Sequence, residues 1–149
     1  MKIGIASDHA GFAMKQELIA YLQGKGHEVL DCGTYSEEST DYAIWGEKLA
    51  NAVACGEAER GIAVCGTGIG IGISCNKVNG IRAAIVSDTV STELTRRHND
   101  ANIVAFGARI IGIVVAEEII DVFLNTPFEG GRHQRRIDQI ADIEKRNRG

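Results

Sequence analysis

The sequence contains no apolar run that approaches the length of about 20 residues needed to cross a bilayer. Its N-terminus, MKIGIASDH, reaches an acidic residue and a histidine before a signal-peptide core could form. It also lacks an excess of positive charge, since the formal net charge is −4. Binding along a nucleic acid requires clustered positive charge. We therefore expect a cytoplasmic protein that has neither a membrane nor a nucleic acid as its partner.

Cysteine pairs of the kind that hold metals or form disulfides are missing as well. The four cysteines form no CxxC pair, and no two Cys or His residues stand at the short spacing typical of mutually supporting zinc ligands. We expect reduced thiols, no disulfide and no metal site. Three of the cysteines (Cys32, Cys55 and Cys75) are interpreted as small buried or half-buried apolar residues.

Strand-like and helix-like patterns alternate along the chain, which at 149 residues and 44% hydrophobic content is long enough for one core. Residues 1–149 are therefore predicted to form a single domain. Short apolar runs predict strands at 2–7, 27–33, 61–66, 80–86 and 102–108. Helical patterns follow at 13–26, 45–54, about 69–77, within 87–100, about 111–124 and within 130–149, and residues 34–44 are predicted to form a polar loop.

Strands that are nearly continuous in Ile, Val and Ala, each followed by a helix, are typical of a parallel sheet covered on both faces. We predict an α/β fold, a three-layer α/β/α sandwich with a sheet of about five parallel strands. In such a sheet, ligands bind at the carboxyl ends of the strands. Several reactive side chains follow predicted strands: Ser7, Asp8 and His9, then Asp41 and Tyr42, then Cys65 and Thr67, and finally Arg109. His98 is also expected near this edge.

The stretch CGTGIGIG at 65–72 follows the third predicted strand. A dinucleotide fingerprint would need glycine at position 71 or 73, and both are isoleucine; a P-loop would need Gly-Lys-Ser/Thr. The glycines instead let backbone N–H groups face an anion. Such a loop favours the thiolate of Cys65, which could act as a nucleophile or a general base. A buried thiol with no role is the alternative, and the flanking glycines favour the reactive one.

Two arginines, Arg132 and Arg136, stand four residues apart on one face of the predicted final helix. A pair of guanidinium groups suits the several oxygens of a monophosphate. The alternative is a solvated helix face, as charge runs usually are.

Several motifs together resemble one family. SDHAGF, DCGTY, TDY, CGTGIGIGISCNK, GIRAA, RRHNDANIVAFGAR and EGGRHQRRI occur in the same order as in the type B ribose-5-phosphate isomerases, within the wider family that includes galactose-6-phosphate isomerase subunits. The match runs through essentially the whole chain. It implies a Rossmann-like or flavodoxin-like sandwich that forms a homodimer or homotetramer, with each active site at the dimer interface.

The resemblance also implies an activity, the interconversion of ribose 5-phosphate and ribulose 5-phosphate through an enediolate, without metal or organic cofactor. The resemblance makes Cys65 the base that moves the proton. Thr67 and the amides of Gly66, Gly68, Ile69 and Gly70 stabilise the negative charge on the enediolate oxygen. His98, with Asp8 nearby, opens the sugar ring. Tyr42 and Asn99 hold hydroxyls. The phosphate is held by His9, Arg109, Arg132 and Arg136, some of them from a partner subunit; the role of His133 is left open.

Some positions depart from the family pattern. Ile71 stands where one branch has a glutamate base, so the chain resembles the cysteine branch. Ala43 replaces a usual proline, and Trp45 a usual tyrosine or phenylalanine, at the loop expected to face the sugar. Because the chain keeps Cys65, His98, Asn99 and Asp100, ribose 5-phosphate is placed above a hexose phosphate, such as allose 6-phosphate or galactose 6-phosphate. A sugar-phosphate-binding domain without catalysis is the alternative from another class, and a flavin carrier is disfavoured by the lack of a Ser/Thr-rich loop after the first strand.

Overall fold

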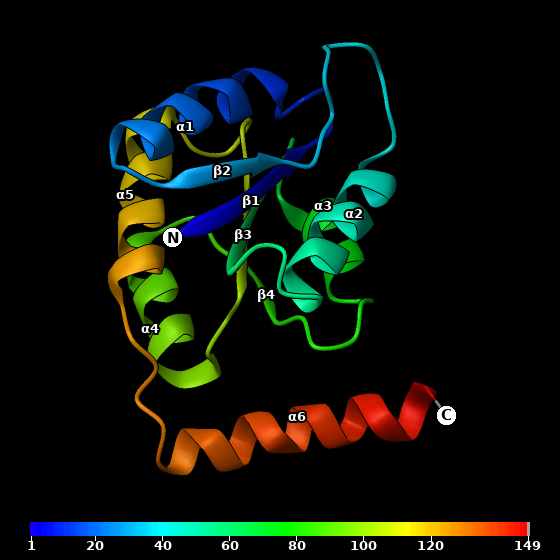
Figure 1. Ribbon diagram of the computed structural model, residues 1–149, viewed down its shortest axis with the longest axis vertical. Coiled ribbons are helices and arrows are strands. Elements are labelled where there is room, and N and C mark those ends of the chain that lie inside the picture. The colour runs from blue at the N-terminus through cyan, green and yellow to red at the C-terminus, as the bar shows by residue number, and fades with distance from the viewer. Residues whose placement is uncertain (149) are drawn as a thin grey trace.

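Strands and helices alternate along the computed structural model, which describes residues 1–148 (Figure 1). The strands are β1 (Lys2–Ser7), β2 (Glu28–Asp31), β3 (Arg60–Cys65), β4 (Ala83–Ile85) and β5 (Ile103–Gly107). The helices are α1 (Phe12–Gly24), α2 (Tyr42–Ala54), α3 (Ile69–Cys75), α4 (Thr89–Asn99), α5 (Ile113–Asn125) and α6 (Arg132–Arg148). Within residues 1–148, no helix combines the length and the apolar character that crossing a bilayer requires.

All neighbouring strands are parallel, and their order is β2-β1-β3-β5-β4. The predicted five-stranded parallel sheet is thus confirmed. The order differs from the flavodoxin order 2-1-3-4-5 only in that β4 and β5 exchange places. Burial explains the exchange: every residue of the apolar strand β5 is buried, whereas the three residues of β4 are half-buried or exposed and suit an edge.

The sheet separates two apolar layers, as expected for a three-layer sandwich. Leu18 and Leu22 of α1 and Phe123 of α5 pack in one layer, and Leu49 of α2 and Ile71 of α3 pack in the other. Residues along a strand point alternately to the two faces. Consequently Ile62 and Val64 of β3 join the first layer, and Ala63 and Cys65 join the second, where the loop before α3 lies.

Most element boundaries lie within two residues of the predicted ones, and two starts differ by three residues. The helix expected at 45–54 begins three residues earlier, at Tyr42, because Asp41 has extended backbone angles and the helical conformation starts directly after it. The strand expected at 80–86 is confined to Ala83–Ile85. The predicted start of α4 is confirmed: Asp88 accepts a hydrogen bond from the amide of Ser91 at 2.6 Å, as an N-cap residue does.

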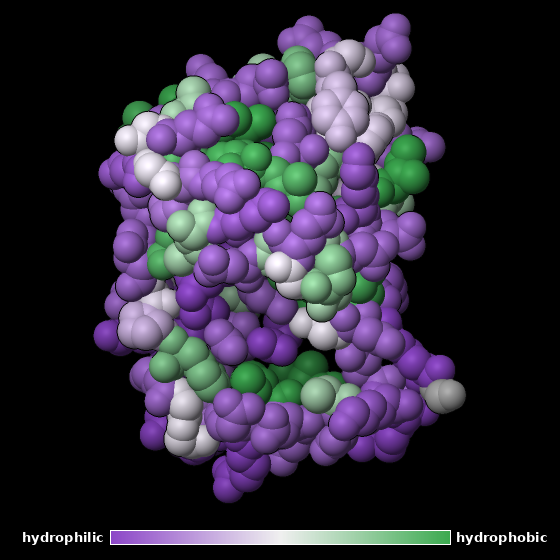
Figure 2. All heavy atoms as spheres, viewed as in Figure 1, coloured by the Kyte–Doolittle hydropathy of each residue, from purple (hydrophilic) through white to green (hydrophobic). Residues whose placement is uncertain are grey.

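Helix α6 lies apart from both layers and crosses the molecule at the edge of the sheet where α4 ends (Figure 1). Its far end is held by Glu144, which accepts a hydrogen bond from the amide of Gly80 at 3.0 Å. Between α6 and the sheet is a cavity of about 580 Å³, with Ile81 on one side and Ile140 and Ile143 on the other. Figure 2 shows this hollow and the apolar residues inside it. Helix α6 therefore bridges a gap that its own side chains do not fill.

Candidate active site

Cys65 ends β3 and is 4% exposed, with its side chain on the face covered by α2 and α3. The amide N–H of Gly68 donates a hydrogen bond to its Sγ at 3.1 Å. Hydrogen bonds from backbone amides stabilise a thiolate more than a thiol. Among residues 1–148, the amides of Thr67 and Gly70 have no hydrogen-bond partner. The loop therefore offers donors to an anion directly beside the sulfur.

The shape of this loop depends on Gly68, whose φ is +81°. A Cβ at this position would lie 2.6 Å from the backbone of Phe106 in β5. No side chain fits, so the glycine is required both for the left-handed turn and for the contact with β5. The amide of Ile69 is already used, because it donates to Oγ1 of Thr67 at 3.2 Å. Of the predicted anion-binding amides, that of Ile69 is therefore not free.

Tyr42 and Arg109 lie against the same loop, as predicted. A Cβ at Gly70 would lie 2.6 Å from Cε1 of Tyr42, and one at Gly66 would lie 3.1 Å from Nη1 of Arg109. The Arg109 amide also donates to the carbonyl of Gly66 at 3.0 Å. The phenol and the guanidinium thus flank the amides that follow Cys65.

Asp8 and His9 follow β1 and lie at the same sheet edge, because the amide of Asp8 donates to the carbonyl of Val64 at 3.3 Å. The Asp8 carboxylate is buried and accepts hydrogen bonds from the amides of Ala10 and Gly11 at 3.0 and 3.2 Å. It therefore fixes the turn that carries His9. The imidazole Nδ1 of His9 lies 3.1 Å from the amide nitrogen of Thr40, which donates to it.

Four other predicted site residues lie elsewhere: His98, Asn99, Arg132 and Arg136. Asn99 ends α4 beside Arg82, which precedes β4, and Asn102 bonds to Gly61 at the start of β3. These residues therefore lie at the amino ends of the strands. The expectation that His98 stands near the ligand edge, with Asp8 nearby, is wrong within one chain. A helix that follows a parallel strand runs back along the sheet, so the end of α4 is opposite to Cys65.

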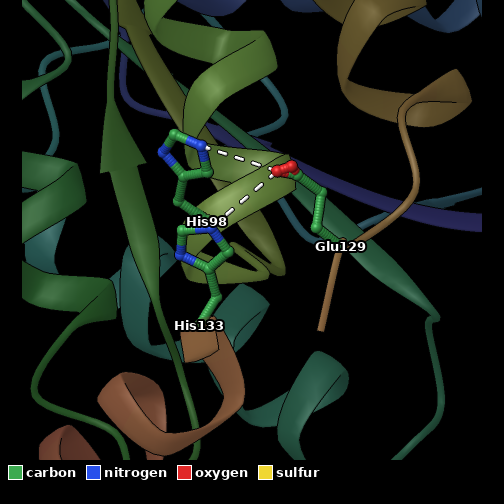
Figure 3. A group of neighbouring side chains, drawn as sticks. All are labelled: His98, Glu129 and His133. Atoms are coloured by element: carbon green, nitrogen blue, oxygen red, sulfur yellow. Dashed lines mark ion pairs between the residues drawn. The ribbon is translucent and has the colours of Figure 1, made fainter. Parts of the chain in front are cut away.

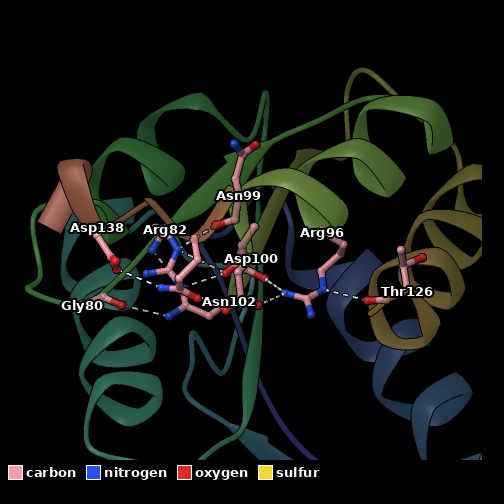
Figure 4. Close-up of polar contacts among 10 residues, drawn as sticks. Gly80, Arg82, Arg96, Asn99, Asp100, Asn102, Thr126 and Asp138 are labelled. Atoms are coloured by element: carbon pink, nitrogen blue, oxygen red, sulfur yellow. Dashed lines mark hydrogen bonds and ion pairs between the residues drawn. The ribbon is translucent and has the colours of Figure 1, made fainter. Parts of the chain in front are cut away.

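The end of α4 is fixed by two arginines that converge on Asp100 (Figure 4). Arg96, which is 3% exposed, binds Oδ1 of Asp100 at 2.8 Å and the carbonyl of Thr126 at 3.1 Å. Arg82 donates to the carbonyls of Asn99 and Asp100 at 2.8 and 2.9 Å. Asp100 has a φ of +46°. This network holds the chain reversal directly after His98 and ties it to the segment that leads into α6.

His98 is stacked on His133 of α6, with ring centroids 4.3 Å apart and an interplanar angle of 15°. The Nε2 atoms of both rings lie 3.8 Å from Oε1 of Glu129 (Figure 3). Burial, and then positive charge at His98 and Arg132, lowers the pKa of His133 below its ordinary value. His133 is buried on α6, while Arg132 and Arg136 stay exposed on the same helix.

These three residues are also the group within the described part of the chain whose ligand atoms lie close enough to hold a metal ion, within 4.8 Å of one another. The ring geometry does not fit such an ion. A metal binds an imidazole nitrogen in the plane of the ring at about 2.0–2.1 Å. An ion midway between two nearly parallel rings would lie above one plane and below the other. The two imidazole rings are therefore placed to share the carboxylate of Glu129 rather than a metal ion.

The remaining cysteines are free, with Cys32 and Cys75 buried as expected. Cys55, expected to be buried or half-buried, is exposed because it follows the last residue of α2. Burial raises the pKa of Cys32 to about 11 and that of Cys75 to about 12. Neither thiol is therefore a competitor to Cys65 as a reactive group.

Sequence reasoning missed several residues around the site: Thr40, Arg82, Arg96, Glu129 and the buried ion pair of Lys15 with Asp31 at 2.6 Å. All of them except Lys15 lie within the motifs quoted for the family resemblance, but no role was assigned to them there. Their importance depends on contacts between segments distant in the sequence, such as Arg96 with Thr126. Burial of a charged side chain would mark these residues as important. The sequence does not show that Lys15 or Arg96 is buried.

The chain is similar to known sugar phosphate isomerases in sequence and in fold. Residues 3–140 match the family model described as Ribose/Galactose Isomerase. Ribose-5-phosphate isomerase B of Escherichia coli (strain K12) is 48% identical over 97% of both chains. The solved ribose-5-phosphate isomerase B of Clostridium thermocellum is 49% identical, covers 99% of both chains and superposes with a TM-score of 0.98. That of Mycoplasma genitalium, solved with bound ribulose-5-phosphate, is 38% identical over 97% of this chain and 96% of its own, with a TM-score of 0.91.

Proposed function

The chain belongs to the ribose/galactose isomerase family, and from this premise we propose that it interconverts D-ribose 5-phosphate and D-ribulose 5-phosphate with Cys65 as the base. The observation that carries the proposal is the thiol of Cys65 beside the amides of Thr67 and Gly70, which have no partner among residues 1–148. An aldose–ketose isomerisation needs a base and a site for the negative charge that develops on oxygen. Both are provided within six residues.

The proposed steps are proton transfers only. The Cys65 thiolate removes the proton from C2 of the open-chain aldose, and the electron pair of that C–H bond forms the C1–C2 double bond of an enediolate. The loop amides stabilise the oxygen anion. The thiol then returns its proton to C1 while the hydroxyl proton on O2 moves to O1, which gives the ketose. No electron acceptor or donor is needed, so the steps require no cofactor.

Ring opening requires a second acid–base group, and His98 is assigned to it. This histidine and Cys65 lie at opposite ends of the sheet, and β3 alone spans six residues. At about 3.3 Å per residue, the strand separates them by roughly 15 Å or more. One chain cannot place both groups on one sugar. We therefore propose that the active site lies between two copies of the chain, one providing Cys65 and the other His98.

An exposed apolar surface supports this association. Large side chains that are 41–65% exposed gather on the edge strand β4 and the helices α3 and α4 that flank it: Ile69, Ile73, Ile85, Val90 and Leu94. Exposed apolar residues grouped at one edge of a sheet favour an interaction site there. We propose that a second copy covers this surface in a homodimer, which could pair further into a homotetramer.

The phosphate is assigned to groups from both copies: His9 and Arg109 at the Cys65 edge, and Arg132 and Arg136 from α6 of the partner. Two exposed guanidinium groups on one helix face suit the geometry of a phosphate. Tyr42 and Asn99 are assigned to sugar hydroxyls, because Tyr42 lies on Gly70 and Asn99 is next to His98. The predicted cytoplasmic location stays a prediction.

The test is turnover of ribose 5-phosphate by the purified chain, followed by the appearance of the ketose. Wild type should be active, and Cys65→Ala should lose nearly all turnover while still binding the sugar phosphate. Cys55→Ala is the matched control, since it removes an exposed thiol outside the site. Undiminished turnover by Cys65→Ala would remove this cysteine from the mechanism.

Two alternatives differ in what they predict. A hexose phosphate isomerase would show a higher kcat/KM for allose 6-phosphate or galactose 6-phosphate than for ribose 5-phosphate. A binding domain without catalysis would bind sugar phosphate saturably but would not exchange substrate hydrogen with deuterium from the solvent. The thiol of Cys65 at this loop favours catalysis over binding alone, because binding of a sugar phosphate needs no thiol.

A further inference from the structure

We propose that Trp45 is a positioning residue that orients the imidazole of His9 through Thr40, so that His9 presents a protonated Nε2 to the substrate phosphate. The inference rests on the proposed function for the phosphate role of His9. The arrangement of the three side chains is a property of the free protein and is testable without turnover.

Trp45 lies on α2 and holds both ends of the loop between β2 and α2. At the far end, its indole Nε1–H donates a hydrogen bond to Oγ1 of Thr40 at 3.0 Å. At the near end, its ring lies on Gly33, where a Cβ would come within 2.4 Å of the indole carbons. Tyr35 packs edge-on against the same ring, at 5.8 Å between centroids. A single side chain thus fixes where the loop begins and where it ends.

Because Trp45 fixes the position of Thr40, it also fixes the backbone group that binds His9. The amide N–H of Thr40 donates to Nδ1 of His9 at 3.1 Å and has no other partner among residues 1–148. We assign Nδ1 as the acceptor of this hydrogen bond, which places the proton of the neutral imidazole on Nε2. The Thr40 carbonyl lies 3.2 Å from the same Nδ1 and would accept from it in the other neutral tautomer. In either tautomer Nδ1 faces the backbone of Thr40, so the ring keeps one orientation.

The Nε2 atom of His9 has no partner among residues 1–148 and is free to donate. His9 is half-buried and follows β1, at the sheet edge of Cys65 and Arg109. A donor of fixed direction at this place can bind a phosphate oxygen without first losing rotamer freedom. Removing the indole N–H should weaken phosphate binding and leave the chemistry at Cys65 intact.

Trp45→Phe is the informative variant, because it keeps an aromatic ring on Gly33 and removes the donor. We expect its KM for ribose 5-phosphate to rise about three- to tenfold, as for the loss of one hydrogen bond, with kcat within about twofold. Thr40→Val, which removes the acceptor and keeps the amide, should give the same result. Tyr35→Phe is the control, since its hydroxyl bonds to the carbonyl of Asp31 and the ammonium of Lys48 and does not touch Thr40.

Two further measurements separate positioning from general damage. In the His9→Ala background, Trp45→Phe should have no additional effect on KM. Nitrogen-15 NMR of the free protein should show His9 as the Nε2–H tautomer in wild type and a mixture of tautomers in Trp45→Phe. The inference is overturned if Trp45→Phe changes neither KM nor the tautomer, or if it raises KM equally without His9. Should the chain lack turnover altogether, the proposed function fails and the tautomer measurement alone decides the inference.

Discussion

Two strongly impaired variants, Cys65→Ala and His98→Ala, are expected to regain activity when they are mixed. Each lacks one of the two acid–base groups, and the fold places these groups at opposite ends of a sheet whose strand β3 spans six residues. If the site is shared between copies, a hybrid dimer has one site with both lesions and one site with neither. The intact site should turn over at the wild-type rate.

The expected recovery follows from counting. When a 1:1 mixture exchanges subunits at random, half of the dimers are hybrids and half of the sites in each hybrid are intact, so about a quarter of wild-type activity returns. Ketose formation is measured before and after a dissociation and reassociation step, and native mass spectrometry of variants that differ in mass confirms that hybrids form. A mixture of Cys65→Ala with Cys65→Ser should recover nothing.

The reasoning is refuted if hybrids form and the mixture stays as inactive as its components. That result would mean that Cys65 and His98 do not act on the same sugar from two chains. Recovery without hybrids would instead point to a contaminating isomerase, which the mixture of two Cys65 variants detects.

Three further predictions concern α6 and the chain reversal before β5. Asp100→Asn should lower the free energy of unfolding by about 2–3 kcal/mol in urea titrations, because the buried guanidinium of Arg96 loses its charged partner. His133 has a folded-state pKa below its ordinary 6.5, so the stability that depends on its neutral form is present above pH 6.5 and is lost as pH falls through the lowered pKa. Thermal unfolding of His133→Gln should therefore depend less on pH below 6.5 than that of wild type. Arg136→Ala should raise the KM for ribose 5-phosphate about tenfold or more, and an unchanged KM would assign this arginine to a solvated helix face.

Much of the fold could be predicted because the relevant signals are local. Apolar runs of strand length, each followed by a helical pattern, are sufficient for a parallel sheet with covered faces, and Asp88 marks the start of α4 as a cap residue does. The order of β4 and β5 could not be predicted in this way. It depends on which strand gains more from burial on both faces, and that comparison involves the whole core.

Some residues of the candidate site could likewise be predicted from the sequence, and others could not. Cys65, the glycine loop and Arg109 could be placed together, because each follows a strand and the carboxyl ends of parallel strands meet at one edge. His98 was misplaced although the pattern was sufficient: it stands near the end of the helix predicted within 87–100, and a helix that joins two parallel strands returns to their amino ends. The contacts of Thr40 with His9 and of Trp45 with Thr40 also escaped prediction, since they join residues across a loop of irregular backbone.

By itself the sequence determined the class of fold, the family, and the chemistry available at the end of the third strand, because residue type and spacing along the chain are enough for those. Only the tertiary structure decided that His98 stacks on His133 and shares Glu129 with it. The same holds for the buried arginine that fixes the end of α4, and for the Nε2 of His9, which has no partner among residues 1–148. These contacts join segments that are distant in the sequence, and they depend on which polar groups find partners once the core is packed. CGTGIGIG therefore identifies one half of the proposed site, and the other half is proposed to come from a second copy of the chain.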